Sequence, residues 1–211
     1  MKGPAMTPDE VQALFMREGR YGFARWGRPV VPVVFGVEDE TLGTIKGAIE
    51  AVARLAGHEV AETDAELGAN LMLFFFRDWA ELLEVPNLGE MIPDLAATVA
   101  RLEAAGATQY RAFRFDEAGA IRACFVFLRM AGGMEKLPAE TIALIQAVQA
   151  ILTWGDGAFS ETPPLALHPE TGAALLRPEI AEVIRAAYDP VLPAASDDPA
   201  HALRLFARMQ R

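Results

Sequence analysis

Cysteine and histidine are scarce in this chain. Its 211 residues include a single cysteine, Cys124, and three histidines, His58, His168 and His201. One cysteine cannot form an internal disulfide, and it gives no indication of the redox compartment. The histidines lie far apart in unrelated segments, so their spacing does not favour a metal site, and we expect them in exposed or capping positions. The sequence therefore predicts no bound metal and no other cofactor.

Positive charge and long apolar runs are also in short supply. The chain has 19 lysines and arginines against 29 aspartates and glutamates, a formal net charge of −10. This balance disfavours nucleic acid and anionic membrane surfaces as partners. No apolar run approaches the roughly 20 residues that a membrane span needs, and Met1–Thr7 lacks the apolar core of a signal peptide. We expect a small molecule or another protein as the partner, in either the cytoplasm or the periplasm.

Several common catalytic motifs are missing as well. Gly132 and Gly133 belong to no G-x-G-x-x-G or G-x-x-x-x-G-K-[ST] pattern, which argues against phosphate binding by their loop. Ser160 has no G-x-S-x-G context, which argues against a hydrolase nucleophile elbow. Cys124 lies within an apolar strand-like run, where a thiol is a small core residue rather than a nucleophile.

What the chain does have is a large apolar fraction, 52%, enough for a substantial core. Neither an internal repeat nor a shift in composition marks a domain boundary. We therefore predict a single α+β domain, in which helices pack on a mixed sheet of four to five strands. Within it we distinguish an N-terminal helix and linker (1–28), the α+β domain itself (29–190) and a C-terminal helix that can pack on it (191–211).

Hydrophobic periodicity and turn residues predict the order of the elements. The run of apolar residues at 70–77 is typical of a central strand buried on both faces. Pro32 indicates an edge strand or a bulge. The expected elements are helix 8–18 capped by Thr7, linker 19–28, strand 29–36, helix 38–56, short strand 58–63, strand 70–77, short helix 78–83, helix 92–105, hairpin strands 108–115 and 120–130, long helix 138–154, irregular loop 155–177, and helices 178–188 and 199–209.

The long helix 138–154 is the element that we expect to organise the fold. It carries an apolar stripe at helical spacing, and Leu144 and Ile151 lie off that stripe, so the helix is apolar most of the way round and should be buried. Only Gln146 and Gln149 interrupt its apolar surface, three residues apart and therefore on one face.

The order of elements, together with three short segments, carries a resemblance. The segments are Trp154–Gly155–Asp156 at the end of the long helix, Ala158–Phe159–Ser160–Glu161 after it, and Ala187–Tyr188–Asp189–Pro190. The chain resembles the zincin-like, and in particular the metzincin-like, architecture. More narrowly, its last third resembles an uncharacterised domain-of-unknown-function family of bacterial envelope proteins with that presumed fold.

The resemblance lacks the zinc motif. Zincins carry His-Glu-x-x-His on the long helix, because two imidazoles four residues apart bind Zn²⁺ and the glutamate acts as a base. Here Leu144 or Ile145 stands where the first histidine would be, Gln149 where the second would be, and Gln146 where the glutamate would be. The resemblance therefore implies a scaffold without the metal.

The sequence favours a non-catalytic binding or interaction protein, with a ligand cleft beside the long helix. The expected binding residues are Gln146, Gln149, Trp154, Asp156 and His168, and no residue is given a catalytic role. Amide side chains cannot exchange a proton near neutral pH, and they suit recognition by hydrogen bonding better than bond breaking.

Two other functions stay open, and so does an anion site. A hydrolase would use Asp156, Glu161 or His168 from the loop after the long helix. A structural subunit would act through an exposed aromatic patch of Tyr21, Phe23 and Trp26, although such residues can also fold back and cover the core. Finally, Arg111 and Arg122 can face each other across the predicted hairpin, which would offer a site for an anion.

Overall fold

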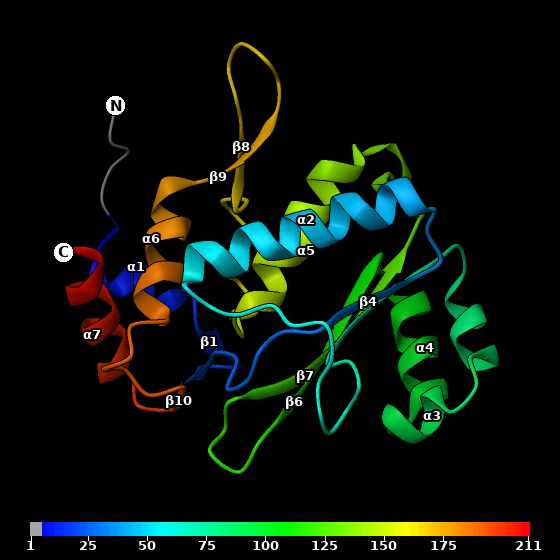
Figure 1. Cartoon of the computed structure of the whole chain (residues 1–211), viewed down its shortest axis with the longest axis horizontal. Coiled ribbons are helices and arrows are strands. Elements are labelled where there is room, and N and C mark those ends of the chain that lie inside the picture. Colours follow the sequence, from blue (N-terminus) through cyan, green and yellow to red (C-terminus); the bar gives the residue numbers. More distant parts are fainter. Residues whose placement is uncertain (1–5) are drawn as a thin grey trace.

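The computed structural model describes residues 6–211, and it has a four-stranded mixed sheet at its centre (Figure 1). The expectation about a signal peptide concerns Met1–Thr7, and the first five of these residues lie outside the described part. The strands are β4 (Pro32–Phe35), β5 (Leu71–Phe76), β6 (Gln109–Phe115) and β7 (Ile121–Arg129), in the order β4-β5-β7-β6. β4, β5 and β7 are parallel, and β6 is antiparallel to β7 at the edge. The single α+β domain, the inner position of β5 and the edge position of Pro32 are confirmed.

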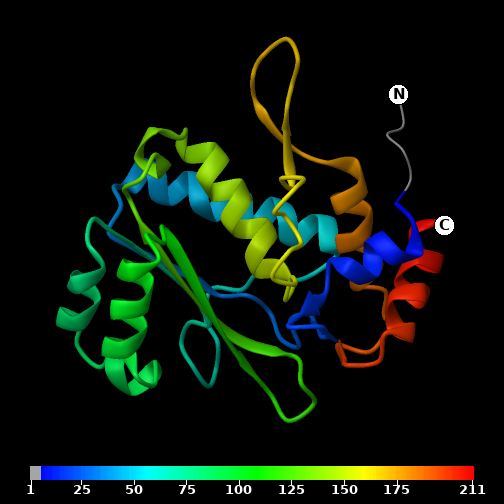
Figure 2. The same cartoon turned by 180° about the vertical axis from the view of Figure 1, so that it is seen from behind.

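Two helices cover one face of the sheet. Helices α2 (Asp39–Ala56) and α5 (Ala139–Ile151) lie side by side on this face and pack against each other (Figure 2). The sheet side chains below them are small or branched, and they form one core with both helices. Because α5 packs against both α2 and the sheet, seven of its thirteen residues are buried, including Gln146. The expected burial of this helix is confirmed.

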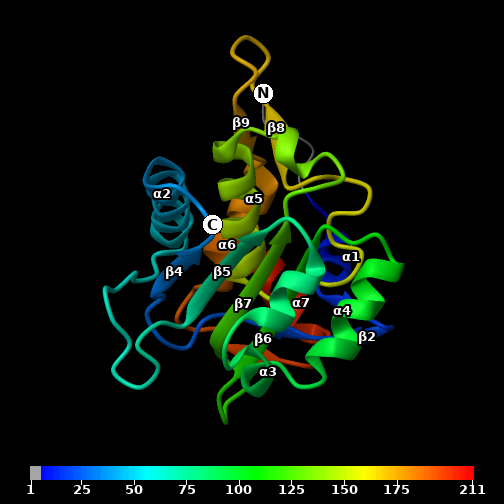
Figure 3. The same ribbon diagram turned by 90° about the vertical axis from the view of Figure 1, so that its right-hand side faces the viewer.

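Aromatic side chains fill the opposite face. Phe74, Phe76 and Phe127 share a second core with buried residues of η1 (Trp79–Glu84), α3 (Leu88–Met91) and α4 (Leu95–Ala104). Figure 3 shows α3 and α4 on the face of the sheet opposite to α5. Alternate residues of β5 and β7 thus serve two different cores, which is why both strands are almost continuously apolar.

The register of the β6–β7 hairpin decides which side chains face α5. Arg111 lies opposite Val126, and Phe113 lies opposite Cys124. Val126 and Cys124 belong to the core under α5, so Arg111 and Phe113 are on that face too. Arg122 has no such partner, since the register shifts between Arg114 and Phe115. The predicted pairing of Arg111 with Arg122 across the hairpin is therefore wrong.

The predicted linker 19–28 is also wrong. After α1 (Pro8–Ala13), the chain forms β1 (Met16–Arg17), which pairs with β2 (Arg20–Tyr21), and β3 (Phe23–Ala24), which pairs with β10 (Ala195–Ser196). Helices α1 and α7 (Ala200–Met209) lie against each other (Figure 1). The aromatic side chains of this segment are at most 5% exposed, so they cover the core instead of forming a surface patch: Tyr21, Phe23 and Trp26.

Four predicted elements differ from the observed ones in their extent or type. The long helix stops at Ile151, because Leu152 is extended (φ −139°) and bridges to Arg25. The loop 155–177 is not wholly irregular: it contains the projecting hairpin of β8 (Leu165–Leu167) and β9 (Ala174–Leu176), followed by α6 (Pro178–Ala187). Helix 92–105 begins only at Leu95, after Asp94 takes a positive φ of 53°. Segment 58–63 contributes one bridge between Val60 and Val30 instead of a strand. None of the helices within 6–211 combines the length and the apolar character needed to cross a bilayer.

Candidate functional site

A pocket of about 510 Å³ lies beside the C-terminal half of α5. Four segments that are distant in sequence form its walls: β1, the edge strand β6, α5 and the loop that follows α5. Its lining residues are Arg17, Gln109, Tyr110, Arg111, Phe113, Gln149, Trp154, Gly155, Asp156, Phe159 and Ser160. β6 is the edge strand on this side of the sheet, so the side chains that it presents toward α5 lie at the border of the sheet.

Arg111 connects β6 to α5 at the base of this pocket. Its Nη2 donates to the Oε1 atoms of Gln109 and Gln146, and the Gln146 amide nitrogen donates to Gln109 Oε1 at 3.3 Å. Gln146 is 2% exposed, so it lies beneath the pocket and positions the guanidinium. Burial lowers the pKa of Arg111 to about 10, which leaves the side chain charged at neutral pH.

Two buried polar atoms of the lining residues have no hydrogen-bond partner among the described residues. They are Nε of Arg111, a donor, and Oε1 of Gln149, an acceptor. A buried polar group without a partner costs about 1–3 kcal/mol, which is why such groups are rare in folded proteins. Both belong to side chains that line the same pocket, so a molecule bound there can satisfy them.

Arg17 and Asp156 also line the pocket. Arg17 donates through Nε and Nη2 to the carbonyl oxygen of Trp154, at 3.0 and 2.6 Å, and this leaves Nη1 without a partner in the described chain. Asp156 is exposed, and its Oδ2 accepts from the backbone N–H of Glu18 at 3.2 Å. These contacts hold β1 against the segment that follows α5. They place a positive and a negative side chain in the lining of one pocket.

Trp154 forms a wall of the pocket. Its indole N–H donates to the carbonyl oxygen of Val148 at 2.8 Å, and its ring stacks on Phe15 with centroids 5.5 Å apart. Only 7% of Trp154 is exposed, and Phe159 packs against the ring at a tilt of 58°. Trp154 therefore shapes the pocket with little free ring surface for stacking on a ligand.

The structure brings four of the five expected binding residues together. Gln149, Trp154 and Asp156 line the pocket, and Gln146 supports Arg111 beneath it. His168 lies apart, on the projecting β8–β9 hairpin, where its Nδ1 accepts from the backbone N–H groups of Glu170 and Thr171, both at 3.3 Å. A capping position is one of the two that the sequence predicts for the histidines.

The other histidines differ from that expectation. His201 is fully buried, with its Nδ1 hydrogen-bonded to the Tyr21 hydroxyl at 2.9 Å and its ring against Phe23. His58 is partly buried, and its Nε2 hydrogen-bonds to the carbonyl oxygen of Arg28. An exposed position for His201 is wrong because α7 packs on the N-terminal strands. Within residues 6–211, no three of the His, Cys, Asp and Glu side chains are grouped so that they could hold a metal ion.

Sequence reasoning missed Arg17 and misjudged Arg111. Arg17 meets the end of α5 across 137 positions of sequence, and a two-residue strand carries no periodic signal that would place it. The register of the hairpin, which no local pattern shows, gives Arg111 its place. Arg122 instead forms an ion pair with Glu66 on another surface.

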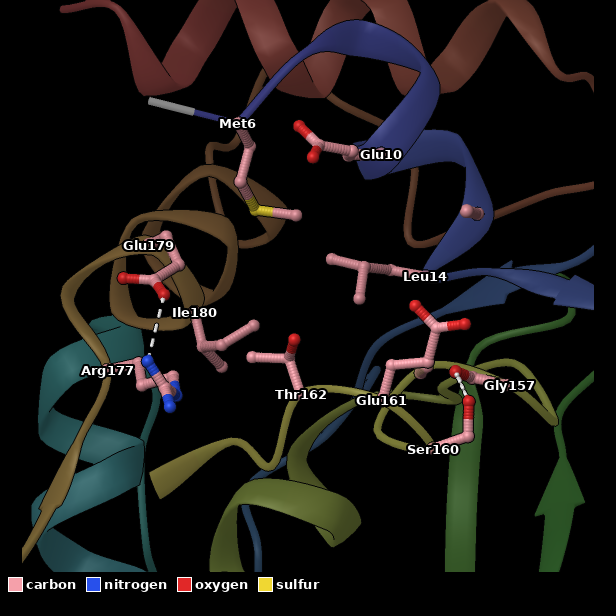
Figure 4. Close-up of a pocket in the computed structure, with 12 residues that line it drawn as sticks. Met6, Glu10, Leu14, Gly157, Ser160, Glu161, Thr162, Arg177, Glu179 and Ile180 are labelled. Atoms are coloured by element: carbon pink, nitrogen blue, oxygen red, sulfur yellow. Dashed lines mark hydrogen bonds and ion pairs between the residues drawn. The ribbon is translucent and has the colours of Figure 1, made fainter. Parts of the chain in front are cut away.

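A second hollow, of about 630 Å³, lies between α1, α6 and the loop after α5 (Figure 4). Most of its polar side chains already form hydrogen bonds or ion pairs within the protein. Glu10 closes the capping box of α1, because its carboxylate accepts from Thr7, which holds the Glu10 pKa below its usual value. Arg177 pairs with Glu179 at 3.8 Å, and Ser160 Oγ donates to the Gly157 carbonyl oxygen at 2.9 Å. Figure 4 shows Glu161 on this side, across from Glu10.

The loop residues proposed for hydrolysis do not meet in one place. Asp156 lines the pocket beside α5, Glu161 lines the second hollow, and His168 is on the hairpin. Cys124 lies under α5 with no exposed surface, and burial raises the pKa of its thiol to about 12. The pocket beside α5 thus offers charged and amide groups that can hold a ligand.

Comparison of the chain with protein-family models, with curated proteins and with solved structures gives no match, so its function is inferred from the pocket itself.

Proposed function

We propose that this chain is a non-catalytic binding protein that holds a small polar molecule in the pocket beside α5. The observation that carries the proposal is the pair of buried, unpartnered atoms, Arg111 Nε and Gln149 Oε1, on side chains that line one cavity. A protein keeps such atoms at a cost in stability, and a ligand that supplies one acceptor and one donor removes that cost.

The second hollow supports no equivalent proposal. Its glutamates and arginine already have partners within the chain, apart from Glu161 at the edge. The structural-subunit alternative is also weakened, because the aromatic residues that it needs are buried: Tyr21, Phe23 and Trp26.

We also propose that the scaffold is a zincin-like one from which the metal site has been lost. The support is the long buried helix α5, which packs on one face of a mixed sheet with an antiparallel edge strand. Gln146 and Gln149 stand where the base and the second zinc ligand of a zincin would be. In this chain Gln146 accepts a hydrogen bond from Arg111, and Gln149 lines the pocket. The same helix would then serve recognition in place of metal chemistry.

Thermal denaturation in the presence of a metabolite library tests the binding function. A ligand at one hundred times its dissociation constant stabilises the native state by about 2.7 kcal/mol. For a chain of this size, that corresponds to a rise in melting temperature of roughly 5–10 °C. We expect at least one polar metabolite to produce such a rise in the wild type.

Two variants locate the binding. Gln149→Leu removes a polar wall of the pocket and should abolish most of the rise, whereas Glu161→Gln, in the second hollow, should leave it intact. The reverse pattern would place the ligand in the second hollow and refute the proposal. A library that stabilises neither the wild type nor Glu161→Gln would also count against it.

A further inference from the structure

The arginines of the pocket lack the carboxylate partners that others in this chain have. Arg28, Arg122, Arg177 and Arg208 each form an ion pair within residues 6–211. Neither Arg17 nor Arg111 forms one there, although the chain has ten more acidic than basic residues. Two cations facing one cavity favour an anionic group on whatever binds in it.

The same pocket also demands a hydrogen-bond donor. Gln149 Oε1 is a buried acceptor without a partner, and the Asp156 carboxylate lines the same pocket, where only a backbone N–H is bonded to it. A sulfate would have no donor for the Gln149 oxygen, and the charge of either a sulfate or a phosphate would be repelled by Asp156. An ammonium group is a donor that suits either acceptor.

The remaining walls are aromatic. Tyr110, Phe113 and Phe159 line the pocket together with the edge of Trp154. These side chains offer apolar surface, which favours a ligand with an apolar body.

From these three features we infer that the ligand is a zwitterionic α-amino carboxylate with an apolar or aromatic side chain. Its carboxylate binds Arg17 and Arg111, its ammonium binds Gln149 and Asp156, and its side chain lies against the aromatic wall. This inference rests on the proposed binding function and names the chemical class of the molecule.

Isothermal titration calorimetry on the full chain at pH 7.5 tests it with four related probes. L-phenylalanine has both charged groups, L-phenylalaninamide lacks the carboxylate, 3-phenylpropionate lacks the ammonium, and phenyl phosphate carries a different anion. Because a hydrogen bond to a charged group contributes about 1.5–3 kcal/mol, L-phenylalanine should bind roughly tenfold or more tightly than each of the other three. Equal affinity of L-phenylalanine with any of these three would overturn the inference.

Single substitutions assign each half of the ligand to its partner. Arg17→Met should lower the affinities for L-phenylalanine and 3-phenylpropionate by the same factor, about tenfold. The affinity for L-phenylalaninamide should not change. Gln149→Leu should lower the affinity for L-phenylalanine toward that for 3-phenylpropionate, and it should leave the affinity for 3-phenylpropionate unchanged. Arg114→Met is the matched control, since Arg114 is on the same strand but lies over Phe125 on the other face of the sheet.

Failure of the inference and failure of the binding function have different signatures. If another metabolite stabilises the wild type through Gln149 while L-phenylalanine does not bind at millimolar concentration, the ligand class is wrong and the binding function stands. If no compound acts through Gln149, both are wrong. Circular dichroism of each variant shows that a loss of affinity does not come from unfolding.

Discussion

Acidification should destabilise the protein through one buried imidazole. His201 has no exposed surface, and burial is the main reason that its pKa falls from 6.5 to about 4. The nearby positive charges of Arg204 and Arg25 lower the pKa further, and Asp198 opposes them. Its Nδ1 hydrogen-bonds to the Tyr21 hydroxyl, while its Nε2 has no partner within residues 6–211, so neither ring nitrogen is hydrogen-bonded to a carboxylate there.

The sign and the size of the effect follow from these values. Between pH 6.5 and about 4, the unfolded chain binds a proton at this histidine and the native chain does not, so the free energy of unfolding decreases as the pH falls. Each pH unit in this window is worth about 1.4 kcal/mol, which gives a loss of about 3 kcal/mol from this residue alone. Below pH 4 the residue contributes no further change. Burial lowers the pKa of His58 too, so it adds a loss of the same sign.

Urea denaturation at pH 8, 6, 5 and 4 measures this loss. We expect His201→Gln to remove about 3 kcal/mol of the difference in stability between pH 8 and 4, because a glutamine can accept the Tyr21 hydrogen bond but does not titrate. His168→Gln, on the exposed hairpin, is the control and should keep the wild-type slope. A His201→Gln variant with the full wild-type slope would refute the reasoning.

Three further substitutions test parts of the fold by urea denaturation or hydrogen exchange. Asn70→Ala should cost about 3 kcal/mol of unfolding free energy, because the buried Asn70 side chain makes three hydrogen bonds; a cost below about 1 kcal/mol would contradict this. Gly155→Ala should cost about 2 kcal/mol or more, since a Cβ there would collide with the Met16 backbone, whereas Gly157→Ala, with ordinary space around it, should be nearly neutral. Thr7→Ala removes the cap of α1 and should cost about 1 kcal/mol, seen as faster amide exchange confined to that helix; unchanged exchange would argue against the capping box.

The sheet and its helices could be predicted because their patterns are local. Strand β5 is a continuous apolar run, and α2 has a regular stripe between an acidic first turn and Gly57 at its end. Such signals depend only on neighbouring residues. The segment 19–28 was misjudged for the opposite reason, since its strand β3 pairs with β10, more than 170 residues later.

The pocket could be predicted only in part. The two glutamines of α5 break an apolar helix, so they stand out in the sequence, and both are at or beneath the pocket. The charge of the pocket could not be predicted, because Arg17 and Arg111 reach it through long-range contacts and through a hairpin register that local residues do not fix. His168 followed the helix closely in sequence, yet the β8–β9 hairpin carries it away.

The contact of the N-terminal strands with α7 has a consequence for biosynthesis. Tyr21 and its hydrogen-bonding partner His201 are 180 positions apart. The ribosome therefore adds His201 only as the 180th residue after Tyr21. During that interval the apolar side chains around Phe15 and Phe23 have no cover from the final helix. This core can therefore be completed only after α7 has been synthesised, and the emerging N-terminal segment is a natural target for a chaperone that binds apolar chain during synthesis.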